Sequence, residues 1–398
     1  MLTSLALMFL IGMVLGWIFN RFRLPNLLGM LVAGILLGPH ALNLLDSSIL
    51  GISPDLRELA LIIILMRAGL SLDINDLKRV GRPAILMCFL PACFEIIGMI
   101  IVAPRLLGVS VLDAAIMGAV VGAVSPAVIV PKMLYLMEKR YGTGKSVPQL
   151  IMAGASVDDV FVIVLFAAFV GLAQGKSISL ASFLQIPFSI INGAAAGILL
   201  GIGVAYLFKR IHVRDSAKVV VMLSISFLLV ALETWSKNII PFSGLLAVMS
   251  LGASLQKKNG SVAKRLSSKF SKLWVGAEII LFVLVGATVD LGYAYYAGMP
   301  AIFVILSVLA FRMTGVFFCM LKTTLNLKER VFCMIAYVPK ATVQAAIGSI
   351  PLALGLSCGN IVLTVAVLAI LITAPLGAFG IDMTYKRLLR NEETGAFS

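Results

Sequence analysis

Charged residues and histidine are both scarce in this 398-residue chain. Asp, Glu, Lys and Arg together make up 13% of it, while 61% of the residues are hydrophobic. Soluble globular domains carry about 25% charged residues, so this composition excludes a soluble domain. The only two histidines, His40 and His212, lie at the ends of apolar segments. They exclude a histidine-rich metal site and do not favour a histidine pH sensor.

Cysteine is also rare, and its placement argues against a disulfide framework. All five cysteines lie in apolar segments: Cys88, Cys93, Cys319, Cys333 and Cys358. An odd number of cysteines in such segments favours neither disulfides nor a thiolate metal site. We therefore expect no cofactor, and nothing in the composition indicates an enzyme.

Apolar runs of about 20 residues make up most of the chain. Each run can cross a hydrocarbon core roughly 30 Å thick, and each is too continuous for the alternating strands of a membrane barrel. The first run follows no basic segment and precedes no clean cleavage site, which favours a spanning helix over a signal peptide. We predict an all-α polytopic membrane protein with 13 spans: 3–19, 25–42, 55–71, 83–104, 111–137, 148–173, 182–208, 218–234, 239–255, 273–291, 294–320, 330–350 and 357–381.

Lys and Arg are distributed unevenly among the connections between these spans. One alternating set of connections, together with the C-terminal tail, holds 24 of them, and the other set holds four. Cytoplasmic loops carry the excess of Lys and Arg, so the N-terminus is predicted outside and the C-terminus in the cytoplasm. The formal charge of +14 is thus a topology signal rather than the mark of a nucleic-acid partner. The predicted location is a bacterial-type inner (plasma) membrane.

Two predicted spans carry a proline near the middle. Span 111–137 contains VSPAVIVPKM, with Pro126, and span 330–350 contains YVPKATVQAAIG, with Pro339. Proline removes a backbone donor and clashes with the preceding turn, and such breaks are tolerated where they face protein or water. The two spans occupy matching positions in two six-helix halves of opposite orientation, joined by the helix 182–208. This arrangement predicts the inverted repeats and broken helices of a secondary transporter.

A small group of charged residues lies at membrane depth. Asp158 and Asp159 stand in the middle of MAGASVDDVFVIVLF, Glu95 in span 83–104, Arg312 in span 294–320 and Lys340 beside the second break. A charge at the bilayer centre is unfavourable by at least about 2.5 kcal/mol. Because all five lie near one plane of the predicted topology, we expect them to form a single site.

The residue types suggest a role for each member of this site. Asp158 and Asp159 are hard oxygen ligands for a small cation and also proton carriers, and Ser125 at the first break can add a hydroxyl. Glu95 and Arg312 are expected to form a buried structural ion pair. Lys340 and Arg312 are both candidates for the charge partner that tunes the proton affinity of the aspartates, and the sequence leaves that choice open.

These motifs together resemble the monovalent cation:proton antiporter superfamily. The likeness is greatest to its double-aspartate branch, the NapA-like bacterial and mammalian NHA-like Na⁺/H⁺ exchangers. It is carried by RLPNLLGMLVAGILLGP, RAGLSLD, PACFE, VSPAVIVPKM, ASVDDV and VPKATVQAAIG, over nearly the whole chain. The resemblance implies an NhaA-like antiporter fold in which two broken helices cross. It also implies core helices over 83–173 and 294–381, scaffold and dimerisation helices over 1–71 and 218–291, a linker helix over 182–208, a cytoplasmic tail over 382–398, and a homodimer.

The resemblance also implies a function and assigns roles. Asp159 corresponds to the essential cation ligand, and Asp158 to the aspartate that a lysine pairs with in electrogenic members, where this chain has Arg312. The implied activity is Na⁺(Li⁺)/H⁺ antiport by elevator-like alternating access, with Na⁺ or Li⁺ bound at Asp159 and Asp158. A K⁺/H⁺ antiporter of the same fold is one alternative. An intramembrane aspartyl protease is a second, although its two aspartates would lie on different helices and GxGD is absent.

Overall fold

The computed structural model of the chain describes residues 1–22, 24–72, 81–174, 180–211, 213–236 and 240–392. Within these ranges the regular structure is helical, apart from an isolated bridge between Tyr141 and Asn391. Eight of the described helices are long and apolar enough to cross a membrane. Six residues used in the predictions above lie outside these ranges. Five of them belong to the count of Lys and Arg in the connections, Arg23, Lys78, Arg79, Lys176 and Lys237, and the sixth is His212.

The chain divides into two compact units. The first unit comprises Met1–Pro54, Asp76–Gln174 and Leu281–Ser398, and the second comprises Asp55–Asn75 and Gly175–Ile280. Every residue of the predicted site lies in the first unit. The assignment of 1–71 and 218–291 to a dimerising scaffold, and the inverted repeat itself, stay predictions.

The second unit is held together by closely packed helices. Its helices are α4 (Ser53–Ser71), α11 (Leu180–Arg210), α12 (Asp215–Trp235), α13 (Gly244–Lys258) and the larger part of α14 (Gly260–Ala287). A Cβ atom on Gly193, Gly197 or Gly201 of α11 would lie 2.2–2.6 Å from a backbone oxygen of α13 or its N-cap. Small residues at such a contact let helix backbones approach closely, which is how membrane helices gain packing energy.

Helix α14 begins earlier than the sequence suggested. The predicted span started at residue 273, whereas α14 starts at Gly260. Its first turns carry Lys264 and Lys269 on the exposed side, while Ala263, Leu266 and Phe270 are buried. The start of α14 is thus an amphipathic helix. Its charged face lowers the average hydropathy of the segment, so the sequence there resembles a loop.

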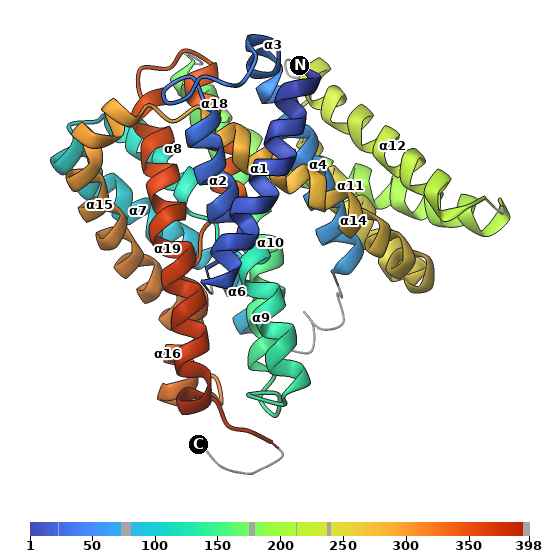
Figure 1. Cartoon of the computed structure of the whole chain (residues 1–398). Coiled ribbons are helices and arrows are strands. Elements are labelled where there is room, and N and C mark those ends of the chain that lie inside the picture. The colour runs from blue at the N-terminus through green and yellow to red at the C-terminus, as the bar shows by residue number, and fades with distance from the viewer. Residues whose placement is uncertain (23, 73–80, 175–179, 212, 237–239, 393–398) are drawn as a thin grey trace. The chain divides into compact units, whose positions relative to one another are not determined.

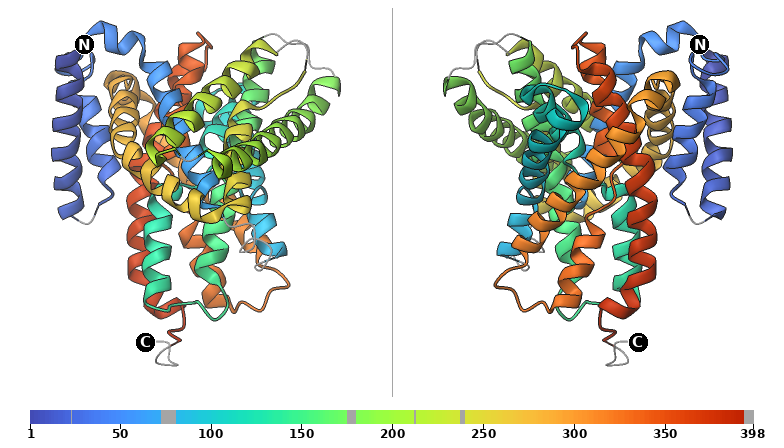
Figure 2. Two further views of the ribbon diagram at one scale, coloured as in Figure 1. Left: turned by 90° about the vertical axis from the view of Figure 1, so that its right-hand side faces the viewer. Right: turned by 90° about the vertical axis from the view of Figure 1, so that its left-hand side faces the viewer.

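The first unit begins with a helical hairpin. Helices α1 (Leu2–Arg21) and α2 (Asn26–Leu37) lie side by side, at the blue end of the chain in Figure 2. A Cβ on Gly29 would lie 2.3 Å from the Leu15 carbonyl oxygen, so the close contact requires glycine there. A short helix, α3 (Ser47–Gly51), follows, and the side chain of Asp46 caps it by accepting a hydrogen bond from the Ser48 N–H.

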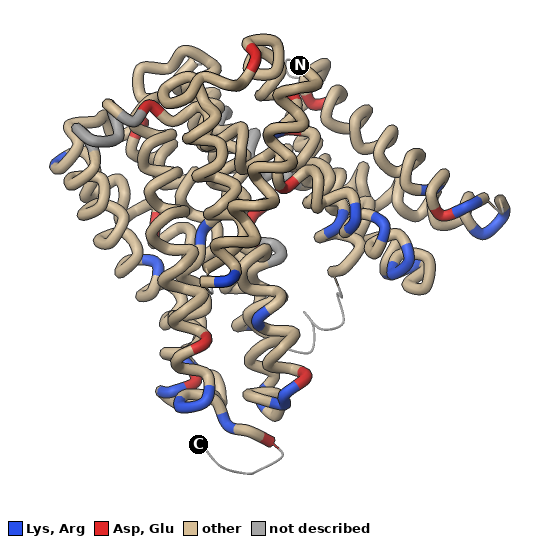
Figure 3. The backbone as a smooth tube through the Cα atoms, in the orientation of Figure 1, with Lys and Arg blue, Asp and Glu red and all other residues tan. Residues whose placement is uncertain are grey.

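The remaining helices of the first unit position the site (Figure 1). They are α6 (Arg82–Met87), α7 (Leu90–Leu107), α8 (Val111–Val121), α9 (Pro126–Glu138), α10 (Val147–Ala173), α15 (Leu291–Cys319), α16 (Leu327–Ala336), α17 (Thr342–Ile347), α18 (Ile350–Ala353) and α19 (Gly359–Leu388). Helix α19 runs on past residue 381, where the predicted span ended. In Figure 3 the Lys and Arg residues of this unit gather mostly where α9 and α19 end and α16 begins.

Both predicted helix breaks are present. Residues 122–125 separate α8 from α9, and Pro126 is the first residue of α9. Residues 337–341, which include Pro339, separate α16 from α17. The first position of a helix tolerates proline, because an N–H at that position has no hydrogen-bond partner within the helix. The first break therefore lies on the N-terminal side of its proline.

A third break was not expected. The predicted span 83–104 corresponds to the stretch Arg82–Leu107, which is long and apolar enough to cross a membrane, but this stretch consists of two helices, α6 and α7, separated at Cys88 and Phe89. Pro91 explains the interruption. In a continuous helix its ring would collide with the Met87 carbonyl, and it has no N–H to donate to that oxygen.

Close packing brings α7 and α15 together. The two helices run side by side (Figure 1). A Cβ on Gly98 of α7 would lie 2.6 Å from the Phe311 ring, and a Cβ on Gly315 of α15 would lie 2.9 Å from the Pro91 Cα. The absence of side chains at these two glycines lets Glu95 on α7 approach Arg312 on α15.

Candidate ion-binding site

The two interrupted helices meet at their breaks. The Ser125 N–H donates a hydrogen bond of 2.8 Å to the Pro339 carbonyl oxygen. The Gln344 side-chain amide donates to the carbonyl oxygens of Val121 and Ala123, at 3.1 and 2.9 Å. Backbone groups that lose their intrahelical hydrogen bonds at one break thus form hydrogen bonds with groups of the other break. Buried backbone groups in a membrane protein need such partners.

Arg312 is the centre of a buried ionic network around this crossing. Its Nη1 lies 2.8 Å from Glu95 Oε2, and its Nη2 lies 2.8 Å from Asp158 Oδ2. The same guanidinium donates to the carbonyl oxygens of Tyr337, at 3.0 Å, and Gly122. The planar fork of arginine suits such simultaneous binding of several oxygens from different helices.

Lys340 extends the network by one ion. Its Nζ lies 2.6 and 2.8 Å from the two oxygens of Glu95, and it donates to the Val121 carbonyl at 2.7 Å. The side chains of Lys340, Glu95, Arg312 and Asp158 have no solvent exposure. Two cations and two carboxylates give this cluster a formal charge of zero, so each buried charge is compensated.

The structure thus decides between the two candidate partners. The sequence leaves Lys340 and Arg312 both open as partners of the aspartates, and in the structure Lys340 binds Glu95 while Arg312 binds Asp158. Asp158 Oδ2 also accepts a hydrogen bond of 2.8 Å from the Val124 N–H at the first break. The expected contact between Glu95 and Arg312 is present as well, and Arg312 therefore bridges two carboxylates instead of one.

Asp159 lies outside the network. The residue is 7% exposed, and its Oδ1 is buried without a hydrogen-bond partner among the described residues. Consecutive helical residues point about 100° apart, so Asp159 cannot share the orientation that places Asp158 against Arg312. Within the described part of the site, Asp159 is the carboxylate that has no cation.

Several other oxygens at the crossing also have no hydrogen-bond partner among the described residues. They are Ser125 Oγ, Asp158 Oδ1, Tyr337 Oη, Thr342 Oγ1 and Gln344 Oε1. Ser125 is the N-cap of α9 and Thr342 is the first residue of α17, so each hydroxyl lies at the end of a break. A buried polar atom without a partner is unfavourable, and oxygens of this kind are the ligands that hard cations prefer.

Thr342, Gln344 and Tyr337 were not identified from the sequence. Thr342 and Gln344 lie three and five residues after Pro339 in VPKATVQAAIG, where two polar residues interrupt an apolar segment beside a break. That placement was the available signal. The aromatic ring of Tyr337 gave none, because tyrosine is common in membrane helices.

Lys132 belongs to a different contact. It forms an ion pair with Asp382, which links α9 to α19, and both side chains are partly exposed. Lys132 is therefore separate from the buried network.

The geometry also argues against the protease alternative, because Asp158 and Asp159 lie on the same helix, α10, and Asp158 is bound to Arg312.

Comparison with known proteins identifies the family. The model of the family described as "Sodium/hydrogen exchanger, transmembrane" matches residues 5–387. The chain belongs to this family. Sodium/hydrogen exchanger 9B2 of Mus musculus is 34% identical over 386 residues, covering 93% of this chain and 69% of the mouse protein. Sodium/hydrogen exchanger 9B1 of Homo sapiens is 31% identical over 379 residues, covering 89% and 70%.

A solved structure of a sodium proton antiporter has the same fold. The sodium proton antiporter MjNhaP1 from Methanocaldococcus jannaschii, determined at pH 8, superposes with a TM-score of 0.85. The alignment covers 96% of this chain and 97% of that one at 19% identity. The predicted antiporter fold, the multi-pass all-α class and the predicted superfamily are therefore confirmed. The relatives are named as exchangers, which are transport proteins rather than enzymes.

Proposed function

We propose that this membrane protein is a secondary-active antiporter that exchanges Na⁺ or Li⁺ for protons, with Asp159 binding the cation and the proton alternately. The observation that carries the proposal is the contrast between two neighbours. Asp158 is neutralised by Arg312, while Asp159 is a buried carboxylate without a cation partner among the described residues. Membership of the exchanger family supports cation/proton exchange as the activity.

Competition between the cation and the proton for the Asp159 carboxylate is sufficient to couple the movement of the cation to that of the proton. With a proton or a bound cation, Asp159 is neutral overall, and with neither it is a buried charge that is costly to move through a low-dielectric region. The conformational change that alternates access is therefore favourable only when the site is loaded. Ser125 Oγ, Thr342 Oγ1 and Asp158 Oδ1 supply further oxygens for the cation, since none of them has another partner among the described residues.

The ionic network holds the moving body together. Arg312 joins α15 to α7 and α10, and Lys340 joins the second break to α7 and to the end of α8. In an elevator-like movement these helices would shift as one body and carry Asp159 from one side of the membrane to the other. The remaining helices would form the scaffold through which two copies dimerise.

The same geometry favours exchange of one cation for one proton. Arginine does not lose its proton in proteins, so Arg312 remains charged and keeps Asp158 ionised throughout the cycle. Asp158 and Arg312 then contribute no transported proton. Only Asp159 changes its occupant, and the exchange transfers no net charge.

We further propose a bacterial-type inner (plasma) membrane, with the N-terminus outside and the C-terminus in the cytoplasm. The distribution of Lys and Arg among the connections supports this orientation. Within the first unit, the end that carries the C-terminus is also the end where basic residues gather (Figure 3).

Transport in proteoliposomes tests the proposal. The protein is reconstituted with a pH-sensitive dye inside the vesicles, and Na⁺, Li⁺ or K⁺ is added outside. We expect Na⁺ and Li⁺ to drive proton movement in the parent protein and not in Asp159→Asn. Asp382→Asn, which removes a partly exposed carboxylate, is the matched control and should exchange normally. Undiminished exchange by Asp159→Asn would refute the role of Asp159, and a response to K⁺ alone would favour the K⁺/H⁺ alternative.

A further inference from the structure

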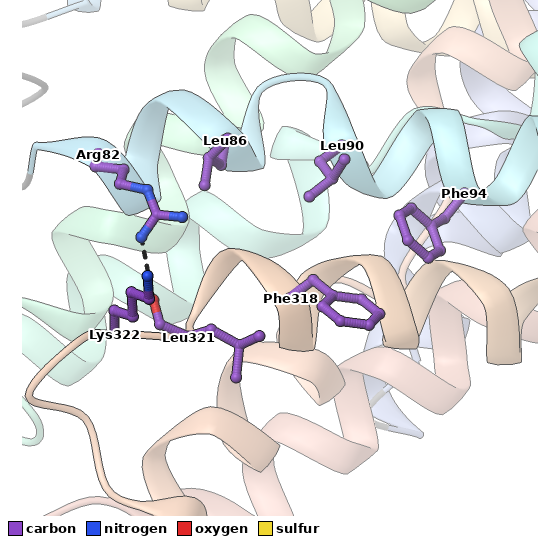
Figure 4. Close-up of a pocket in the computed structure, with 7 residues that line it drawn as sticks. All are labelled: Arg82, Leu86, Leu90, Phe94, Phe318, Leu321 and Lys322. Carbon is purple, nitrogen blue, oxygen red and sulfur yellow. Dashed lines mark hydrogen bonds between the residues drawn. The ribbon is translucent and has the colours of Figure 1, made fainter.

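A groove of about 390 Å³ lies on the first unit, away from the charged residues of the crossing. Its residues come from α6 and α7 on one side and from the end of α15 on the other (Figure 4). They are Arg82, Leu86, Leu90, Phe94, Phe318, Leu321 and Lys322. The lining is thus five apolar side chains and two cations, and it includes no acidic residue.

The apolar part of the groove is elongated. Leu86 lies on α6, and Leu90 and Phe94 lie on α7. The three side chains follow one another along the groove in Figure 4, across the interruption at Cys88 and Phe89. The rings of Phe94 and Phe318 lie 5.5 Å apart and join the two sides of the groove.

The two cations lie at one end of this apolar face. Arg82 and Lys322 are both exposed, and they flank the groove in Figure 4. Arg82 Nη1 donates a long hydrogen bond of 3.5 Å to the Leu321 carbonyl oxygen, which holds the guanidinium near Lys322. A guanidinium has five N–H donors, so several remain for a ligand.

The backbone at Lys322 determines where this second cation lies. Lys322 has a φ of 59°, in the left-handed region that usually holds glycine or asparagine. A lysine in this conformation is strained, and glycine would relieve the strain. Residues held in such conformations are concentrated at functional sites. The conformation directs a lysine to the mouth of an apolar groove, beside an arginine.

We infer that this groove binds one anionic phospholipid of the cytoplasmic leaflet, with its phosphate between Arg82 and Lys322 and an acyl chain along Leu86, Leu90 and Phe94. The charge complementarity and the apolar length argue for a lipid over a soluble anion or a protein segment. Both cations also belong to connections that the Lys and Arg distribution places in the cytoplasm, where anionic lipids attract basic residues.

Such a lipid would act on the site through packing. The groove joins α6 and α7 to α15, and α7 and α15 carry Glu95 and Arg312. A bound lipid would therefore stabilise the helix pair whose side chains form the centre of the ionic network. The expected result is a lipid-dependent rise in the melting temperature of the protein.

The test measures thermal unfolding of the full chain in a neutral detergent during titration with lipid. The probe is dioleoyl-phosphatidylglycerol, and dioleoyl-phosphatidylcholine has the same acyl chains without net charge. We expect the anionic lipid to raise the melting temperature of the parent protein. Arg82→Gln/Lys322→Gln should weaken the apparent affinity roughly tenfold to thirtyfold, as two lost basic residues near a membrane surface predict.

The control variant removes two other exposed basic residues of the first unit. Lys139→Gln/Arg387→Gln carries the same change in net charge, and it should leave the affinity within about twofold of the parent. Equal loss in both double variants, equal stabilisation by phosphatidylcholine, or full stabilisation by inorganic phosphate alone would each overturn the lipid site.

A single substitution tests the same site if the double variant does not fold. Lys322→Gly relieves the backbone strain, so it should be at least as stable as the parent without lipid. It should bind the anionic lipid about fivefold more weakly, the effect of one basic residue. Unchanged lipid affinity in Lys322→Gly would contradict the role of Lys322. Neither readout depends on transport, so this result is separate from that of the exchange assay.

Discussion

Arg312 Nη2 lies 2.8 Å from Asp158 Oδ2, and both side chains are completely buried. Arg312 is bound to Asp158 and to Glu95, and Asp159, one residue further along α10, has no ion-pair partner among the described residues. Two aspartates that are adjacent in the sequence therefore have different environments. Asp158 is bound in the ionic network, and Asp159 is the carboxylate that we propose for the transported ion.

The first prediction concerns Asp159. Asp159→Asn removes a buried carboxylate that has no ion-pair partner among the described residues, so the free energy of unfolding should stay the same or rise. Exchange should nevertheless be lost, because the asparagine cannot carry a proton or a charge. Thermal unfolding in detergent, alongside transport in vesicles, checks both parts. A large loss of stability in this variant would mean that Asp159 has a structural partner.

Asp158 should behave in the opposite way. Asp158→Asn leaves Arg312 with one carboxylate instead of two, and it breaks a buried ion pair. Removing one partner of such a pair typically destabilises a protein by about 3–5 kcal/mol. We expect a clearly lower melting temperature than in Asp159→Asn. A double-mutant cycle with Arg312→Gln would measure the coupling, and a coupling near zero would contradict the pairing.

The stoichiometry can be tested through the membrane potential. If Asp158 stays ionised beside Arg312, one cation exchanges for one proton and no net charge moves. The initial rate of Na⁺-driven proton movement should then be the same with the potential clamped at zero and at a negative value. A rate that rises steeply with potential would show that a second proton is transported.

Two hydroxyl groups are expected to affect cation affinity more than stability. Ser125 Oγ and Thr342 Oγ1 are buried without hydrogen-bond partners among the described residues. Ser125→Ala and Thr342→Val remove a potential ligand without breaking a hydrogen bond that the structure contains. The apparent KM for Na⁺ should rise about tenfold, equivalent to roughly 1.4 kcal/mol, while the melting temperature changes little. Unchanged KM values in both variants would place the cation elsewhere.

The second helix break depends on a glycine of α19. A Cβ on Gly377 would lie 2.2 Å from Pro339 Cγ and 2.9 Å from Pro339 N. Gly377→Val should therefore displace the break, destabilise the protein by about 1–3 kcal/mol and reduce exchange. Gly380→Ala on the same helix is the control. Its Cβ would meet only the Ile335 side chain, which can move. Equal effects of the two substitutions would argue against a specific contact with Pro339.

The span pattern and the candidate residues could be predicted from the sequence because each depends on local chemistry. Apolar runs of membrane length indicated the helices, and proline at the first helical position or within a break indicated where α9 begins and α16 ends. The charged residues stood out because charge inside an apolar run is rare. The third break was not predicted, because a proline inside a membrane span, as Pro91 is in 83–104, is also tolerated in a helix that is only kinked.

The sequence by itself determined that this chain is an all-α membrane protein with two broken helices and a small set of buried charges. Only the tertiary structure decided how those charges pair. Arg312 and Asp158 are 154 positions apart, and Lys340 and Glu95 are 245 apart. At such separations the choice of partner depends on how closely helices pack. Gly98 and Gly315 bring α7 against α15, and the bidentate arginine fork then reaches both carboxylates. The lysine binds Glu95, and Asp159 lies outside these ion pairs in the part of the site that the structure describes.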